Sequence, residues 1–130
     1  MKLLLDTHIA IWAVANSARL SDSARALIAD PKNEVVVSVA TLWEIAIKHA
    51  LRRRTEQMPI SATEGEAYFL AAGYGLLGVA AEHVRALEQL PAHHADPFDR
   101  ILVAQAAHES AELLTADARL TGYGAMVRAV

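Results

Sequence analysis

The stretch KLLLDTH, residues 2–8, joins an apolar run without alternation to an aspartate placed directly after it. A run that is apolar at successive positions predicts a strand covered on both faces, which is typical of a parallel sheet. Further runs of this kind follow along the chain. They are EVVVS at 34–38, LLGV at 76–79, ELLT at 112–115 and, as a candidate edge strand, AMVRAV at 125–130.

Stretches that read as helices separate these strands. SATE at 61–64 is a capping box that opens one helix, and DPK at 30–32 ends another. Strands and helices that alternate along one chain predict an α/β sandwich with right-handed crossovers around a mainly parallel sheet of four or five strands. We find no linker or repeat and expect a single domain over residues 1–130. The expected helices span 9–15, 23–29, 41–53, 62–72, 81–90 and 97–110.

The composition excludes several classes of protein. With 54% hydrophobic residues the chain can bury a core, so intrinsic disorder is not expected. It has no cysteine, which excludes disulfides, thiolate zinc sites and cysteine nucleophiles. No apolar run reaches the roughly 18 residues that cross a bilayer, and Asp6 interrupts the run at the N-terminus. We therefore expect a cytoplasmic protein with no membrane partner.

The formal net charge of −3 argues against a protein that binds nucleic acid by bulk positive charge. A local basic cluster remains, and two interpretations of it stay open. It is either the solvated end of a helix, with cations near the C-terminal dipole, or a surface that contacts phosphates. The cluster consists of Lys48, His49, Arg52, Arg53 and Arg54.

The helix expected over 41–53 carries apolar residues on more than one side, so we expect it to be largely buried. Its Trp43, like Trp12 earlier in the chain, could stack on bases, but the apolar neighbours of both favour packing in the core or at an interface. Glu44 lies within this apolar surface, where an unpaired carboxylate would be costly. Lys48 follows one turn later and is the expected ion-pair partner of Glu44.

Four acids are expected at one edge of the sheet. Asp6 follows the first strand directly, and Asp117 comes two residues after the fourth. Glu44 and Asp99 lie early in the helices that follow the second strand and precede the fourth. The carboxyl ends of parallel strands share an edge, and open α/β folds place their ligand crevice there.

Each of the four acids also has a local explanation. Asp6 and Asp117 can cap helices, Glu44 can pair with Lys48, and Asp99 can complete a capping box. We favour one shared cause, because carboxylates gathered together raise each other's pKa unless a cation lies among them. A cluster with only oxygen ligands favours Mg²⁺, with Mn²⁺ as a substitute. Such a site suits the hydrolysis of phosphodiester bonds.

In the segment DPFD, residues 96–99, one aspartate is explained mainly by helix capping and the other by metal binding. Asp96 precedes Pro97 and is expected mainly to cap the helix, with an outer-shell or second-metal role as the alternative. Hydroxyl side chains at strand ends could orient a carboxylate or a water, although capping is an equal alternative for them. These hydroxyl residues are Thr7, Ser38 and Thr115.

Four motifs then occur in one order: LLLDTHIAIW at 3–12, SVATLWEIAIK at 38–48, DPFDRILVAQA at 96–106 and LLTADARL at 113–120. This order resembles PIN-domain ribonucleases, in particular the VapC-type toxins of bacterial toxin–antitoxin pairs. The resemblance implies a Rossmann-like α/β/α sandwich, Mg²⁺-dependent endoribonuclease activity, inhibition by a cognate antitoxin, and a homodimer. We further expect an apolar groove in the N-terminal half for the antitoxin's C-terminal segment.

Carried over by motif, the family's acids fall on Asp6, Glu44, Asp99 and Asp117. We expect Asp6 and Asp99 to contact the metal directly, and Glu44 and Asp117 to contact it directly or through water. With an RNA substrate, the phosphate contacts expected of the basic cluster fall on Lys48, Arg52, Arg53 and Arg54.

Two other classes of protein, phosphatases and phosphotransfer receivers, also use acids at the carboxyl edge of a parallel sheet. The phosphatase class requires a second aspartate two residues after the first, where this chain has His8. A receiver requires a lysine after a later strand, and no lysine follows Lys48 in this sequence. Two alternatives within the same fold remain: a nuclease of RNA processing that has no antitoxin, and a catalytically inactive binding module.

Overall fold

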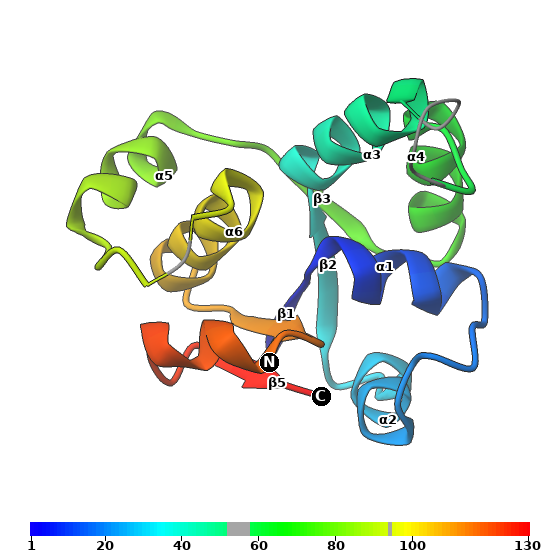
Figure 1. Ribbon diagram of the computed structural model, residues 1–130. Helices are drawn as coiled ribbons and strands as arrows, with labels where there is room; N and C mark the ends of the chain where they lie inside the picture. Colours follow the sequence, from blue (N-terminus) through cyan, green and yellow to red (C-terminus); the bar gives the residue numbers. More distant parts are fainter. Residues whose placement is uncertain (52–57, 94) are drawn as a thin grey trace.

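The computed structural model describes residues 1–51, 58–93 and 95–130 (Figure 1). Its sheet has five strands, all parallel, in the order β3-β2-β1-β4-β5. The fold prediction is confirmed, including the C-terminal strand at an edge. The strands are β1 (Lys2–Leu5), β2 (Glu34–Ser38), β3 (Gly75–Leu77), β4 (Glu112–Thr115) and β5 (Val127–Ala129).

The helices match the expected positions to within a few residues, except that the expected helix over 81–90 divides into an α-helix and a 3₁₀ segment. Residues 52 and 53 of the expected third helix lie outside the described residues. The α-helices are α1 (Thr7–Val14), α2 (Asp22–Ala29), α3 (Val39–Leu51), α4 (Ala62–Ala71), α5 (Ala81–Ala86) and α6 (Pro97–His108). The 3₁₀ segments are η1 (Leu87–Gln89) and η2 (Ala118–Tyr123).

The helices cover both faces of the sheet. Helices α1 to α4 lie on one side, and α5 and α6 lie on the other (Figure 1). In β1, Leu3 and Leu5 pack in the core beneath α1 to α4, whereas Leu4 packs in the core beneath α6. All three side chains are fully buried. Side chains that alternate between two faces explain why an uninterrupted apolar run was the right signal for a central strand.

Helix α3 differs from the expectation that it would be largely buried, and that expectation is wrong. Val39, Trp43, Ile47 and Leu51 are between 39% and 63% exposed. They recur every fourth residue and therefore form a stripe along one side of the helix. The opposite side, which includes Ile45, is buried. The helix meets the core on one side only, so its second apolar side is left at the surface.

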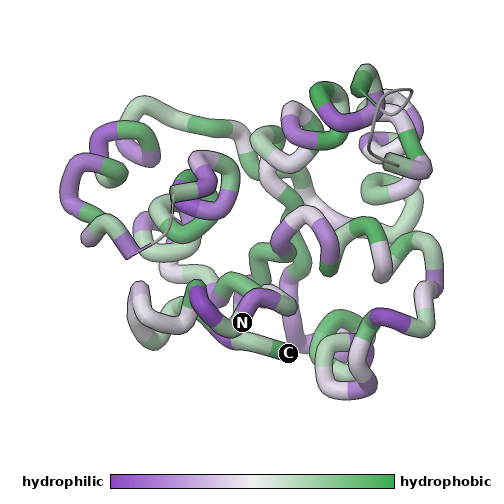
Figure 2. The backbone as a smooth tube through the Cα atoms, viewed as in Figure 1, coloured by the Kyte–Doolittle hydropathy of each residue, from purple (hydrophilic) through white to green (hydrophobic). Residues whose placement is uncertain are grey.

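Figure 2 shows that hydrophobic and hydrophilic residues are mixed along the helices. No helix of the described segments is long and apolar enough to cross a membrane.

Candidate metal centre

The four predicted acids line a single cleft of about 410 Å³. Its position follows from the strand order. The chain runs outward from β1 to β2 and β3, then returns to the other side of β1 for β4, so the topological switch point lies between β1 and β4. The cleft is lined by Asp6, Thr7, His8, Glu44, Lys48, Asp96, Asp99, Ala116, Asp117 and Arg119.

Asp6 both caps a helix and faces this cleft. Its Oδ1 accepts a hydrogen bond from the backbone N–H of Ile9 at 2.9 Å, at the start of α1. The side chain is only 6% exposed, and this burial raises the pKa of Asp6. Hydrogen bonds from Thr115 and Ile9 and the charge of His8 act in the opposite direction, whereas the charge of Glu44 raises the pKa further. A cation beside Asp6 would therefore favour its ionised form.

Glu44 is held at both carboxylate oxygens. Lys48 donates to Oε2 at 2.7 Å, which confirms the predicted ion pair one turn apart. The hydroxyl of Thr7 donates to Oε1 at 2.6 Å and lies 3.3 Å from the hydroxyl of Thr41. Glu44 is only 5% exposed, and these contacts offset the cost of burying its charge.

The predicted hydroxyl residues divide into two groups. Thr7 orients a carboxylate, as described for Glu44. Thr115 hydrogen-bonds the side chain of Asp6 and accepts the backbone N–H of Asp117 at 3.0 Å, so it links two acids of the cleft. Ser38 follows the alternative explanation, because its hydroxyl accepts the backbone N–H of Ala40 at 3.0 Å, at the start of α3.

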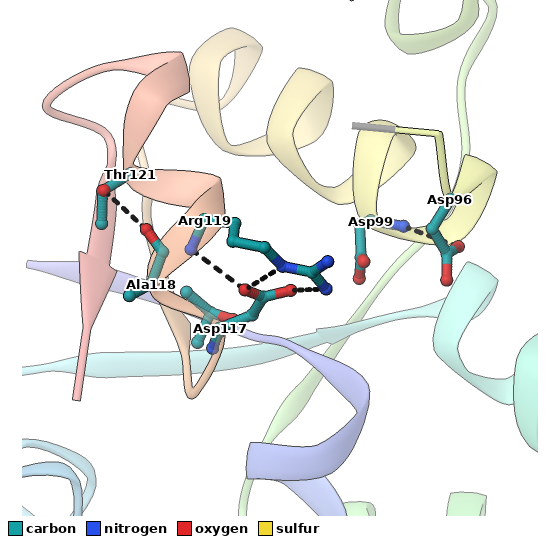
Figure 3. A network of polar contacts seen from close by, with 7 residues as sticks. Asp96, Asp99, Asp117, Ala118, Arg119 and Thr121 are labelled. Atoms are coloured by element: carbon teal, nitrogen blue, oxygen red, sulfur yellow. Dashed lines mark hydrogen bonds and ion pairs between the residues drawn. The ribbon is translucent and has the colours of Figure 1, made fainter. Parts of the chain in front are cut away.

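Asp96 is the N-cap of α6, as predicted. Its Oδ1 accepts the backbone N–H of Phe98 at 2.8 Å and that of Asp99 at 3.4 Å, with Pro97 as the first residue of the helix. Asp99 lies one turn into α6, and Figure 3 shows its side chain directed toward Arg119. The cap therefore sets the direction of Asp99, since it fixes where the helix begins.

Asp117 accepts a fork of hydrogen bonds from Arg119. Its Oδ1 accepts from the backbone N–H and the Nε of Arg119, each at 3.0 Å, and its Oδ2 accepts from Nη2 at 2.8 Å (Figure 3). The hydrogen bond to Asp117 raises the pKa of Arg119, and the charge of Asp99 acts in the same direction. The sequence reasoning missed Arg119. In the sequence DAR a cation stands two residues after a predicted acid, but this spacing alone does not predict the contact.

The donor set of the cleft fits a hard divalent cation. All of the predicted ligands are carboxylates, and no Cys or His is needed to complete the group. Asp6 is buried beside the charge of Glu44, so ionising it without a compensating cation is unfavourable. The residues present therefore suit Mg²⁺ or Mn²⁺.

The basic cluster is only partly described. Lys48 lies at the cleft, and His49 Nδ1 lies 3.4 Å from the carbonyl oxygen of Met58. Arg52, Arg53 and Arg54 lie outside the described residues. Their predicted contact with phosphates stays a prediction.

Residues 3–125 match the family model described as PIN domain. The chain belongs to the PIN-domain family. Proteins with this domain are typically metal-dependent nucleases and generally use divalent metals, which agrees with the chemistry of the cleft.

Solved structures of low identity share the PIN fold over nearly the whole chain. The toxin–antitoxin complex VapBC2 of Rickettsia felis, bound to a promoter DNA fragment, gives a TM-score of 0.69 at 15% identity, over 100% of this chain and 99% of that one. A toxin–antitoxin complex of Klebsiella pneumoniae gives 0.66 at 18%, over 97% and 95%. The sarcin–ricin loop cleaving toxin VapC20 of Mycobacterium tuberculosis gives 0.59 at 23%, over 97% and 98%. No curated protein matches the sequence.

Proposed function

We propose that this chain is a single-domain, Mg²⁺-dependent endoribonuclease that acts as the toxin of a toxin–antitoxin pair. The observation that carries the proposal is the convergence of Asp6, Glu44, Asp99 and Asp117 on one cleft. Two of these acids come from strand ends and two from helices far apart in the sequence. Local capping does not require that they meet.

Asp6 and Asp99 would hold the metal directly, and Glu44 and Asp117 would hold it directly or through water. When bound, Mg²⁺ or Mn²⁺ lowers the pKa of a water and neutralises charge on the scissile phosphate. The chain's own contribution is to fix the carboxylates. Thr7 and Lys48 orient Glu44.

Two further residues order the centre from the sheet edge. Thr115 links Asp6 to the backbone of Asp117, so the acids after β1 and β4 keep a fixed relation. Asp96 positions Asp99 through the start of α6, which supports an outer role and not direct contact with the metal. Carboxylates fixed in this way need little rearrangement to receive a cation, which favours catalysis.

The RNA would approach over the open side of the cleft. The phosphate contacts that we propose are Lys48, Arg52, Arg53 and Arg54. Lys48 is the member of this set that the structure places, and there it donates to Glu44. A phosphate contact from Lys48 would therefore compete with, or be shared with, this ion pair.

The direct test is RNA cleavage by the purified chain, free of antitoxin, with Mg²⁺ or Mn²⁺ and with a chelator as the blank. Asp6→Asn and Asp99→Asn should abolish the cleavage. Asparagine can still cap α1 in place of Asp6, so this change removes the charge and keeps the helix start. Asp22→Asn is the matched control, because Asp22 is an exposed first-turn acid of α2 outside the cleft. Cleavage by the two cleft variants at the parent rate would refute the metal assignment.

A groove beside the cleft supports the pairing with an antitoxin. It has a volume of about 360 Å³, and His8 and Lys48 line both the groove and the metal cleft. Ile11, Trp12 and Met58 give it apolar walls. A peptide segment lying there would reach the mouth of the metal centre and block the access of RNA. We propose that the C-terminal segment of an antitoxin, expected in a groove of the N-terminal half, binds here.

The homodimer is supported by a second surface. The exposed stripe of α3 borders a groove of about 320 Å³ that is lined only by apolar residues. Trp43, which packs edge-on against Phe98 with ring centroids 5.0 Å apart, lies on this groove. An exposed apolar surface of this kind is typical of protein interfaces. Light scattering should find a dimer, and Trp43→Lys should give a monomer.

The alternatives without an antitoxin predict different partners. The product of a small gene beside this one, coexpressed with the chain, should bind it and suppress the cleavage of RNA. Cleavage without any such partner would favour a nuclease of RNA processing. Binding without cleavage, in parent and variants alike, would favour an inactive binding module.

A further inference from the structure

Arg119 is a cation that the chain itself places within the metal centre. Its guanidinium extends from Asp117 toward Asp99, as Figure 3 shows. Nε and Nη2 donate to the two carboxylate oxygens of Asp117 at 3.0 and 2.8 Å. The backbone N–H of Arg119 donates to Oδ1 as well, so Arg119 supplies two donors to that one oxygen. An ionised carboxylate oxygen has about two lone-pair sites, and both of these are used at Oδ1.

The second cation of the centre, Lys48, is held differently. The side chains of Lys48 and Glu44 are 35% and 7% exposed, and Thr7 occupies the other oxygen of Glu44. The side chains of Arg119 and Asp117 are 76% and 28% exposed. Exposed ion pairs contribute little to stability, whereas separating a buried one leaves a charge uncompensated. The Arg119–Asp117 pair is therefore the easier of the two to open.

We propose that Arg119 is an exchangeable counter-ion of Asp117, which it neutralises without metal and releases when a divalent cation binds, whereas Lys48 stays on Glu44. The inference rests on the metal-dependent function proposed above. Two cations within a few ångströms of one carboxylate repel each other. Exchange of Arg119 removes this repulsion without exposing an unpaired acid at any stage.

Because of this exchange, Asp117 would be a ligand only when metal is present. Without metal, the fork of Arg119 holds the carboxylate; with metal, the same oxygens turn to the ion or its water. Glu44 does not change partners, since Lys48 and Thr7 hold both of its oxygens. Glu44 would then act through metal-bound water, and Asp117 would be the acid whose role depends on occupancy.

The experiment follows the Nε–H signal of Arg119 in ¹H–¹⁵N spectra of the whole chain during a titration with Mg²⁺. Arg119→Lys removes the signal and so assigns it. We expect Mg²⁺ to shift this signal and to speed its exchange with water, because the hydrogen bond to Asp117 is lost. Arg128 is the matched control. Its Nε lies 2.7 Å from Glu112 at the other end of β4, so its signal should not change.

Metal affinity gives a second measurement. Titration calorimetry with Mn²⁺ should show about two- to five-fold tighter binding in Arg119→Gln, since the ion no longer competes with an exposed ion pair. Arg128→Gln should bind Mn²⁺ like the parent. Removal of any positive charge near the site would also tighten binding, so the spectrum of Arg119 decides between exchange and simple electrostatics.

Backbone amide signals of residues 6 and 99 report metal binding independently of Arg119. If they respond to Mg²⁺ while the Nε–H of Arg119 keeps its shift and exchange rate, the exchange is refuted and the metal centre stands. If neither the amides nor Arg119 respond, the exchange and the proposed metal centre are both refuted.

Discussion

The two ends of the parallel sheet both place acids beside cations, but they differ in burial. At the carboxyl end, Asp6 and Glu44 are only 6% and 5% exposed. At the amino end, the side chain of Glu112 is 20% exposed beside Arg128, and that of Glu109 is 25% exposed. Water reaches part of the Glu109 and Glu112 side chains, whereas Asp6 and Glu44 are buried and need cations or hydrogen bonds. The two buried carboxylates of Asp6 and Glu44, more than the number of acids, distinguish the end of the sheet that we propose is functional, because Asp117 at that end is 28% exposed.

The pKa values of one acid at each end are also shifted in opposite directions from their ordinary values. Burial raises the pKa of Asp6, whereas a hydrogen bond from His83 lowers the pKa of Glu109. His83 Nδ1 accepts the backbone N–H of Ala80 at 2.9 Å, so Nε2 carries the hydrogen and donates to Glu109 at 3.0 Å. The amino end thus stabilises its carboxylate with groups already present. The carboxyl end is better suited to receive a further cation.

The largest effect on stability is expected from Lys48→Met, which leaves Glu44 buried without its ion-pair partner. We expect a loss of about 1–3 kcal/mol in the free energy of unfolding, the usual cost of an unsatisfied buried polar group. The loss should be toward the low end, because Lys48 is 35% exposed and water can replace part of the contact. Urea unfolding without added metal measures it.

Lys32→Met is the matched control for this change. Lys32 is exposed in the turn before β2, away from the cleft, and its replacement should alter the free energy of unfolding by less than about 0.5 kcal/mol. Equal stability in the Lys48 variant and this control would show that the charge of Glu44 is compensated without Lys48. The contrast between the two ends of the sheet would then lose its main support.

The fold was predictable because central strands and capping residues carry local signals. The run KLLL predicted β1 with its observed bounds, since its three leucines are buried on one face or the other. The burial of α3 was not predictable in the same way. A pattern that is apolar on two sides indicates two contacts, but it does not say whether the second partner is the chain's own core or another molecule. Trp43 lies on the exposed side.

The candidate site was predictable where strand ends determine it. Asp6 and Asp117 follow neighbouring parallel strands, so the sheet order alone brings them together. Arg119 was not predicted, because its contact with Asp117 depends on the tight turn into η2. This turn brings together the side chains of residues i and i+2. In a strand these two side chains would also share a face, but in a regular helix they would not. The partner therefore could not be read from spacing alone.

A smaller effect is expected in the dependence of stability on pH without added metal. Because the folded protein holds the pKa of Asp6 above 3.8, the free energy of unfolding should fall as pH rises from that value through the raised pKa. Glu109 acts in the opposite direction. Its pKa lies below 4.5 in the folded protein, so its stabilisation is present above 4.5 and is lost as pH falls through the lowered value.

Two charge-removing variants separate these contributions. In urea unfolding at a series of pH values, Asp6→Asn should remove the fall above pH 3.8, and Glu109→Gln should remove the loss below pH 4.5. Addition of Mg²⁺ should oppose the fall in the parent, since a cation favours the ionised form of Asp6. The same slope in the parent and Asp6→Asn would mean that burial of this carboxyl does not control its ionisation.

The smallest effect is expected from Arg128→Gln, which breaks the ion pair with Glu112 at the amino end. The side chain of Arg128 is 44% exposed, so the free energy of unfolding should change by less than about 1 kcal/mol and the cleavage of RNA should not change. A larger loss would show that exposure is a poor guide to the importance of these pairs. Arg128 and Arg119 each contact one acid through Nε, but Arg119 also donates through Nη2 and its backbone N–H, so the comparison of their variants tests what the fork at the carboxyl end adds to an exposed ion pair.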